Sequence, residues 1–171
     1  MRGLTFIELL VGLAIIGIFL ACVAPIGWNF ISPNAVWVHV DEMVQAVKEG
    51  ETEARALGEN IVLAPLCETG TACIQDWSKG MQLFVDRDFD NQYTAIDTLL
   101  QVWPWYSKEI EVTWKGWYTD DYLTFSNNSI AHGALSGSFT VCPQNTKDAR
   151  GKKVILNRLG RVRFETYACN S

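Results

Sequence analysis

The sequence contains little of what enzymes use for acid–base or nucleophilic chemistry. Only two of its 171 residues are histidine, His39 and His132, and a convincing acid–base site needs more titratable partners than these. There is no nucleophile elbow of the G-x-S-x-G type and no glycine-rich loop that could cradle a phosphate. The sequence therefore predicts a protein that is not an enzyme.

Cysteine occurs five times, but never in the C-x-x-C spacing that many zinc sites use, so no zinc site is predicted. Cys22 lies within an apolar run, and we interpret it as a free packing residue. The other four, Cys67, Cys73, Cys142 and Cys169, allow three disulfide connectivities. Pairing of nearest neighbours, Cys67 with Cys73 and Cys142 with Cys169, closes a short loop and pins the C-terminus. Such pairing fits an oxidising compartment such as the bacterial periplasm.

One long apolar run lies near the N-terminus. Residues 6–24 are almost all apolar, and the run has about the length needed to cross a bilayer as a helix. Glu8 lies inside this run, where an unpaired carboxylate is costly and marks a functional contact. Arg2 and Gly3 precede the run, whereas a secretory signal peptide has its cleavage site after its apolar segment. These features favour a retained membrane helix over a cleaved signal peptide.

The motif GLTFIELL at residues 3–10 resembles the prepilin motif shared by type IV pilins and type II secretion pseudopilins. The resemblance implies cleavage after Gly3 by prepilin peptidase, N-methylation of the new amine on Leu4, and contact between Glu8 and the N-terminal amine of a neighbouring subunit. It also implies a single-pass protein of the bacterial inner membrane, with its head in the periplasm, that later enters a pilus or pseudopilus filament. A partner charge makes a carboxylate tolerable in lipid, so we expect Glu8 to serve filament assembly.

Helical periodicity continues beyond the apolar run. Pro25 is expected to end or kink the first helix, and Gly27 and Pro33 predict a bend or a short melted stretch. After Pro33, apolar residues recur at steps of three and four with charged residues between them, which predicts an amphipathic helix that ends near Gly58. The apolar residues are Val36, Val40, Val44 and Val47.

From residue 59 onward the pattern changes to short β-like runs separated by turns, and no helical period reappears. The runs are residues 61–63, 81–85, 98–103, 109–117, 122–125, 137–142, 153–157 and 161–167. This order predicts an α+β, pilin-like fold in which a long N-terminal helix packs on an antiparallel β-sheet head domain. The expected parts are a leader (1–3), a transmembrane or filament-core helix (4–25), an amphipathic helix (26–58) and the head (59–171).

Three segments of the predicted head resemble minor pilins and minor pseudopilins of the GspH/FimT family. They are residues 80–86 running to 97–100, residues 123–125 followed by 139–142, and residues 155–163. Residues 125–169 most resemble the FimU-like minor pilins of this family. The resemblance implies a minor subunit that helps initiate or cap a type IV pilus, with other minor pilins and the major pilin as partners. A type II secretion minor pseudopilin is the alternative.

Basic residues gather near the C-terminus, although the formal net charge of the chain is −5 at pH 7. Half of its 14 Lys and Arg residues fall in one stretch: Lys147, Arg150, Lys152, Lys153, Arg158, Arg161 and Arg163. Such charge asymmetry points to an anionic partner. Arg161 and Arg163 alternate, so on a strand both would project from one face, and Gly160 before them suits a tight turn.

This Gly-Arg-x-Arg sequence resembles the motif through which some FimT-type minor pilins bind DNA during uptake. DNA is therefore one candidate partner, bound by Arg161, Arg163, Lys152, Lys153 and Arg158. The alternative is a solvated basic hairpin or a contact with an acidic neighbouring pilin.

An acidic segment follows the spacing of an EF-hand calcium loop. Asp86, Asp88, Asp90 and Asp97 occupy positions one, three, five and twelve of such a loop, where oxygen ligands converge on one ion. Asn91 occupies the position at which that loop has glycine for its sharp turn. No cofactor is predicted apart from this candidate calcium ion, and a polar β-hairpin turn is the alternative.

Aromatic residues crowd into one region of the chain: Trp103, Trp105, Tyr106, Trp114, Trp117 and Tyr118. Exposed aromatic rings can stack on nucleic-acid bases. On strands, however, such residues commonly pack across strands and against a helix. We predict packing, with any exposed members forming a subunit interface.

Overall fold

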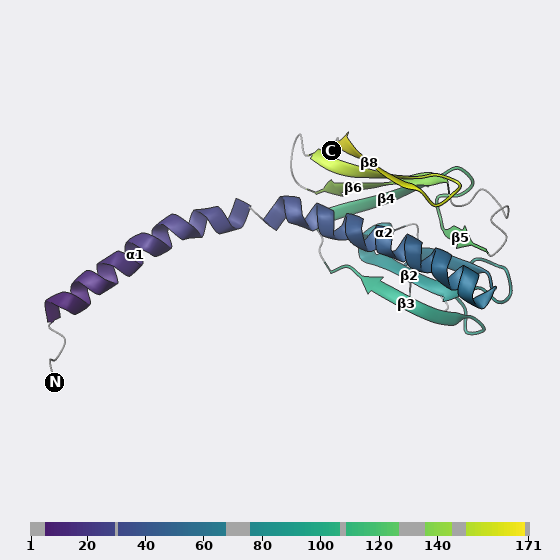
Figure 1. Cartoon of the computed structure of the whole chain (residues 1–171), viewed down its shortest axis with the longest axis horizontal. Coiled ribbons are helices and arrows are strands. Elements are labelled where there is room, and N and C mark those ends of the chain that lie inside the picture. Colours follow the sequence, from purple (N-terminus) through teal and green to yellow (C-terminus); the bar gives the residue numbers. More distant parts are fainter. Residues whose placement is uncertain are drawn as a thin grey trace. The chain divides into compact units, whose positions relative to one another are not determined.

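The computed structural model of the chain (Figure 1) describes residues 6–29, 31–67, 76–106, 109–126, 136–144 and 150–169. The chain divides into two compact units, Met1–Ala35 and Val36–Ser171. The first unit contains one apolar helix. The second contains the amphipathic helix from Val36 onward and both sheets.

Helix α1, Phe6–Asn29, forms most of the first unit. Its large apolar side chains between Phe6 and Ile18 are exposed, by 49% at Leu10 and Ile15 and by up to 78% at Phe6. The helix continues past Pro25, so Pro25 does not end it. A proline removes a single backbone hydrogen bond, and a long helix can accommodate that loss. Among the residues that the structure describes, no helix is both long and apolar enough to cross a membrane.

Helix α2, Ile31–Leu57, has Pro33 in its first turn, where the N–H groups have no helical acceptor and a proline is tolerated. From Val36 onward one face is buried, through Val40, Met43, Ala46, Val47 and Ala54. Gly50 lies on this face and lets the Phe125 ring approach closely, since a Cβ at residue 50 would lie 2.5 Å from that ring. The helix ends at Gly58 as predicted, where φ is +71° and the N–H donates to the Ala54 carbonyl.

The head consists of two four-stranded antiparallel sheets, with strand orders β3-β2-β1-β5 and β4-β6-β7-β8. The first sheet contains β1 (Ile61–Pro65), β2 (Gly80–Val85), β3 (Thr98–Pro104) and β5 (Leu123–Phe125). The second contains β4 (Ile110–Gly116), β6 (Gly137–Pro143), β7 (Arg150–Leu156) and β8 (Val162–Ala168). All eight predicted strands are present, although β7 begins earlier than expected. The predicted α+β fold class is confirmed. The head, however, contains two separate sheets, whereas the sequence predicted one.

Both sheets and helix α2 share one core. Every residue of β1 and β2 is buried, as expected for central strands covered on both faces. The Phe139 ring of β6 lies 5.1 Å from Trp77 in the short 3-10 helix η1 (Trp77–Lys79) and 4.5 Å from Trp114 of β4. β8 lies at the edge of the same sheet, next to β7. Its Phe164 ring lies 6.4 Å from the Trp37 ring of α2. Helix α2 therefore contacts both sheets, as Figure 1 shows.

One predicted disulfide joins Cys142 at the end of β6 to Cys169 after β8. Cys67 is also disulfide-bonded, and its predicted partner, Cys73, lies outside the described residues. So does the side chain of Cys22. The confirmed bond fixes the C-terminal end of the second sheet.

Candidate functional site

The N-terminal candidate site is represented by Glu8, because Gly3 and Leu4 lie outside the described residues. Glu8 is exposed in the first turn of α1, where a carboxylate interacts favourably with the helix dipole. Its neighbours Ile7 and Leu9 are 69% and 54% exposed. The arrangement places one negative charge on a helix surface whose other described side chains are apolar.

The basic residues near the C-terminus occupy two strands and the turn between them. Lys152 and Lys153 lie on β7, Arg163 lies on β8, and Arg161 immediately precedes β8. The turn forms because Asn157 Oδ1 accepts from the Arg161 N–H at 2.9 Å and Gly160 adopts φ +70°. The tight turn at Gly160 is therefore confirmed. Arg150 is exposed at the start of β7, and Lys147 lies outside the described residues.

The two lysines of β7 project from opposite faces of the sheet. Lys152 Nζ lies 4.7 Å from the centroid of the Trp37 ring of α2 and 3.4 Å from Thr166 Oγ1. Lys153 shares the other face with Tyr167, whose ring centroid is 6.0 Å from its Nζ. The structure thus brings Lys153 together with Arg163 but separates both from Lys152.

Carboxylates reduce the positive charge of this surface. Arg163 Nη2 forms an ion pair with Glu165 Oε1 at 2.7 Å, and Glu165 is directly opposite Lys153 in the strand register. A Cβ at residue 160 would collide with the Glu51 carboxylate of α2, so a second negative charge lies beside the Gly-Arg turn. The outer face of β7 and β8 is therefore of mixed charge.

The acidic segment forms the loop between β2 and β3, residues 86–97, which we call the acidic loop. Carboxylate oxygens of Asp86, Asp88 and Asp97 lie within 4.8 Å of one another. Asp90 is not one of this group, and its Oδ1 accepts from the Gln92 N–H at 2.7 Å. Asn91 adopts φ +60°, so it supplies the left-handed turn that an EF-hand obtains from glycine. Strands flank the loop in place of the helices of an EF-hand.

Asp86 is the buried member of the group, with 1% of its surface exposed. Its Oδ2 accepts from Asn60 Nδ2 and from the Asn91 N–H, both at 3.1 Å. Burial raises the pKa of the Asp86 carboxyl, the Asn91 N–H lowers it, and the negative charges of Asp97 and Asp88 raise it further. The ionised form of Asp86 is thus disfavoured at this position, which a bound cation would reverse.

The aromatic residues divide into packed and exposed groups. Trp105 is buried, with its ring 4.6 Å from His39 and its Nε1 donating to Glu42 of α2. Trp114 is also buried, which agrees with the prediction of packing. Three others are exposed at 75% or more: Tyr106, Trp117 and Tyr118.

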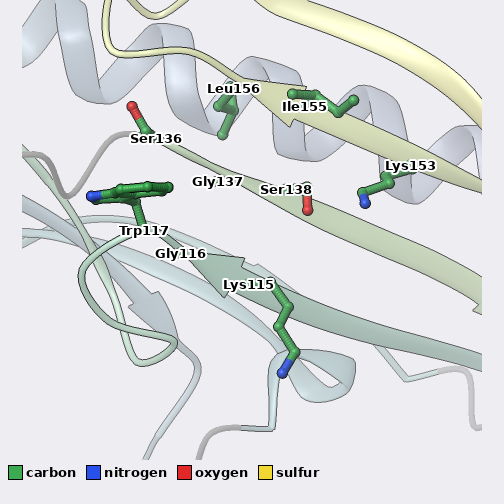
Figure 2. Close-up of a pocket in the computed structure, with 9 residues that line it drawn as sticks. All are labelled: Lys115, Gly116, Trp117, Ser136, Gly137, Ser138, Lys153, Ile155 and Leu156. Atoms are coloured by element: carbon green, nitrogen blue, oxygen red, sulfur yellow. The ribbon is translucent and has the colours of Figure 1, made fainter.

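A shallow hollow of about 320 Å³ lies beside Trp117 and crosses strands β4, β6 and β7. Ser136, Gly137 and Ser138 contribute from the β6 segment, and Lys115 and Lys153 contribute from the neighbouring strands. Figure 2 shows the Trp117 ring on one side of the hollow and the Lys153 amine on the other. Sequence reasoning missed this feature. No local pattern marks it, because its lining comes from three strands that only the β4–β6 and β6–β7 pairings bring together.

Comparison with known proteins agrees with this architecture. The model of the family described as type II transport protein GspH matches residues 39–160. A crystal structure of the type IV minor pilin FimU of Pseudomonas aeruginosa aligns with a TM-score of 0.58 at 18% identity, covering 80% of this chain and 92% of FimU. A second crystal form of FimU aligns with a TM-score of 0.53 at 18% identity, covering 73% and 88%. No curated protein matches the chain. At this identity the likeness to FimU shows the fold.

Proposed function

Because the chain belongs to the GspH family of type II transport proteins, we propose that it is a minor subunit of a type IV pilus. The family consists of structural, pilin-like subunits. In this proposal prepilin peptidase cleaves after Gly3, residues 4–24 are held in the bacterial inner membrane, and the head lies in the periplasm. The same apolar segment then moves laterally into the filament core.

The observation that carries this proposal is the exposed apolar surface of α1. Large side chains are exposed from Phe6 to Ile18, including Leu10, Leu13 and Ile16, each 49% or more exposed. Burying one such side chain contributes about 1.5–3 kcal/mol, so the helix is stable only when other apolar groups cover it. Lipid covers it before assembly, and the apolar helices of neighbouring subunits cover it in the filament.

The head would meet other minor pilins and the major pilin through its surface. Trp117 and Tyr118 are 87% and 75% exposed, and large aromatic side chains are enriched where subunits meet. As a minor subunit, the protein would help initiate or cap the filament rather than form its shaft. This role rests on the family likeness.

A Glu8→Ala variant tests the proposal. We expect it to reach the membrane at wild-type levels but to enter sheared filaments at least about tenfold less, since about 1.4 kcal/mol already corresponds to tenfold and the charge contact in the filament core is lost. Immunoblots of the membrane and filament fractions measure both quantities.

The matched control is Ile16→Leu, which keeps the apolar volume on the same helix and should leave incorporation unchanged. If Glu8→Ala enters filaments as well as the wild type, Glu8 has no assembly role. If neither the wild type nor the Glu8→Ala variant is found in any filament, the proposed function itself is wrong.

A type II secretion pseudopilus is the alternative assembly, because its subunits meet the same constraints on the apolar helix. Deletion of the gene separates the two. Loss of surface pili with normal secretion supports the type IV pilus, whereas loss of secretion with normal piliation supports the pseudopilus.

DNA capture by the C-terminal strands has less support. Arg163 is paired with Glu165, and Lys152 projects toward α2 rather than toward Arg163. We therefore expect only weak, non-specific DNA binding, with Kd of about 10⁻⁴–10⁻⁶ M. An Arg161→Gln/Arg163→Gln variant should change this Kd by less than about threefold in fluorescence anisotropy at low salt.

A Glu165→Gln variant is the charge-matched comparison, because it removes the partner of Arg163 and should strengthen DNA binding slightly. Salt-sensitive binding by the wild type that the double Arg variant loses would instead favour a role in DNA uptake.

A further inference from the structure

A buried carboxylate oxygen at the base of the acidic loop has no hydrogen-bond partner among the residues that the structure describes. It is Oδ1 of Asp86, a residue that is 1% exposed. The other oxygen of the same carboxylate accepts two hydrogen bonds. Leaving a charged oxygen buried and unsatisfied is strongly destabilising. Native proteins normally satisfy such an oxygen with a proton, a water molecule or a cation.

Two further carboxylates approach the same place. One oxygen each of Asp86, Asp88 and Asp97 fall within 4.8 Å of one another, although like charges at this distance repel. Among the described residues, no ion pair joins these three carboxylates to a lysine or arginine. Arg87 is the basic residue that lies nearest to these carboxylates in the sequence. Its Nε–H donates a hydrogen bond to Thr98 Oγ1 instead. Among the described residues, therefore, no lysine or arginine side chain forms an ion pair that would offset the repulsion between these three carboxylates.

We propose that Asp86, Asp88 and Asp97 bind one calcium ion at the base of the acidic loop. Oxygen atoms are the ligands of calcium, which accepts six to eight of them at about 2.3–2.6 Å in flexible geometry. Two oxygens on one calcium ion are thus at most about 5 Å apart, and the 4.8 Å limit in this group fits that span. Asp86 Oδ1 becomes a ligand, and water completes the coordination of an ion bound near the surface.

Magnesium suits the group less well. Its ligands lie at about 2.0–2.1 Å in a near-ideal octahedron that tolerates little deviation, and it gives up its water ligands reluctantly. The hydrogen bonds to Asp97, from the Arg87 N–H to Oδ1 and from Thr94 to Oδ2, also hold that carboxylate in a fixed orientation. The proposed site therefore selects the larger ion.

Calcium titration of the full-length chain in detergent micelles tests the site. We expect one ion per chain by isothermal titration calorimetry, with a Kd of about 0.1–1 mM, the range of extracellular calcium modules. In 10 mM calcium the Tm should rise by about 4–8 °C relative to EDTA. Magnesium at the same concentration and ionic strength should raise the Tm by less than about 2 °C, because it binds more weakly.

Variants within the acidic loop provide matched controls. Asp88→Asn removes an exposed ligand and should weaken calcium binding at least about tenfold, whereas Asp90→Asn removes an equal charge outside the group and should leave the Kd unchanged. Asp86→Asn should abolish the rise in Tm, and its Tm in EDTA should equal or exceed that of the wild type, because the amide can donate to Asp88 or Asp97.

Two results would overturn the proposal. One is the absence of calcium binding by the wild type at 10 mM. The other is an equal weakening by Asp88→Asn and Asp90→Asn, which would show diffuse attraction by an acidic loop rather than a site. Neither result bears on filament assembly, so the site and the proposed function fail separately.

Discussion

A Phe139→Ala variant should lower the free energy of unfolding of the head by about 3–5 kcal/mol. Phe139 is 0% exposed, and its ring contacts Trp77 and Trp114 at centroid distances of 5.1 and 4.5 Å. Truncation removes these aromatic contacts and leaves a cavity that rigid neighbours cannot fill. Since a domain of this size is stable by about 5–15 kcal/mol, the loss is a large share of the total.

Urea unfolding of residues 34–171, followed by far-UV circular dichroism, measures this loss. Trp117→Ala is the matched control, because it removes a larger aromatic ring that is 87% exposed, and it should change the unfolding free energy by less than about 0.5 kcal/mol. A cost below about 1 kcal/mol for Phe139→Ala would mean that Phe139 does not link η1 to the second sheet.

Strand β4 illustrates what local sequence pattern could predict. Ile110, Val112 and Trp114 are buried, while Glu111 and Thr113 between them are exposed. This alternation is a property of the chain itself, so it predicts both the strand and its inward face. The turn at Gly160 was predictable for the same reason, because a left-handed φ favours glycine.

The division of the head into two sheets was not predictable in this way. Among the described strands, β1 pairs with β5 and β4 pairs with β6, whereas β3 does not pair with β4, nor β5 with β4 or β6. Every residue of β2 is buried, and such a strand shows no alternation that would reveal its neighbours. Strand pairing across the chain depends on contacts that local periodicity does not record.

The candidate sites show the same limit. Lys152 and Lys153 were grouped as one basic surface, although neighbouring residues on a strand project from opposite faces. Glu165, two residues after Arg163, was visible in the sequence and belongs on the face of that arginine. The unsatisfied oxygen of Asp86, by contrast, follows from the burial of that residue beside Asn60, which no local pattern contains.

A Cys142→Ser/Cys169→Ser variant is expected to lose about 3–4 kcal/mol of stability. The bond closes a loop with a sequence separation of 27, and a loop of this length constrains the unfolded chain by about that amount. In the folded head the bond passes over β7 at Gly151, where a Cβ would lie 2.5 Å from Cys169 Sγ. It therefore ties β6 to the end of β8 across the strand between them.

Urea unfolding of the oxidised wild type and the double serine variant measures the contribution of this bond. Dithiothreitol added to the serine variant gives the separate contribution of the disulfide at Cys67, because that bond is unaffected by the two substitutions. A loss below about 1 kcal/mol in the oxidised serine variant would mean that hydrogen bonding between β7 and β8 alone holds the C-terminal strand. The expected larger loss would make an oxidising compartment a condition for a stable second sheet. That condition is met in the periplasm, where the proposed subunit has its head.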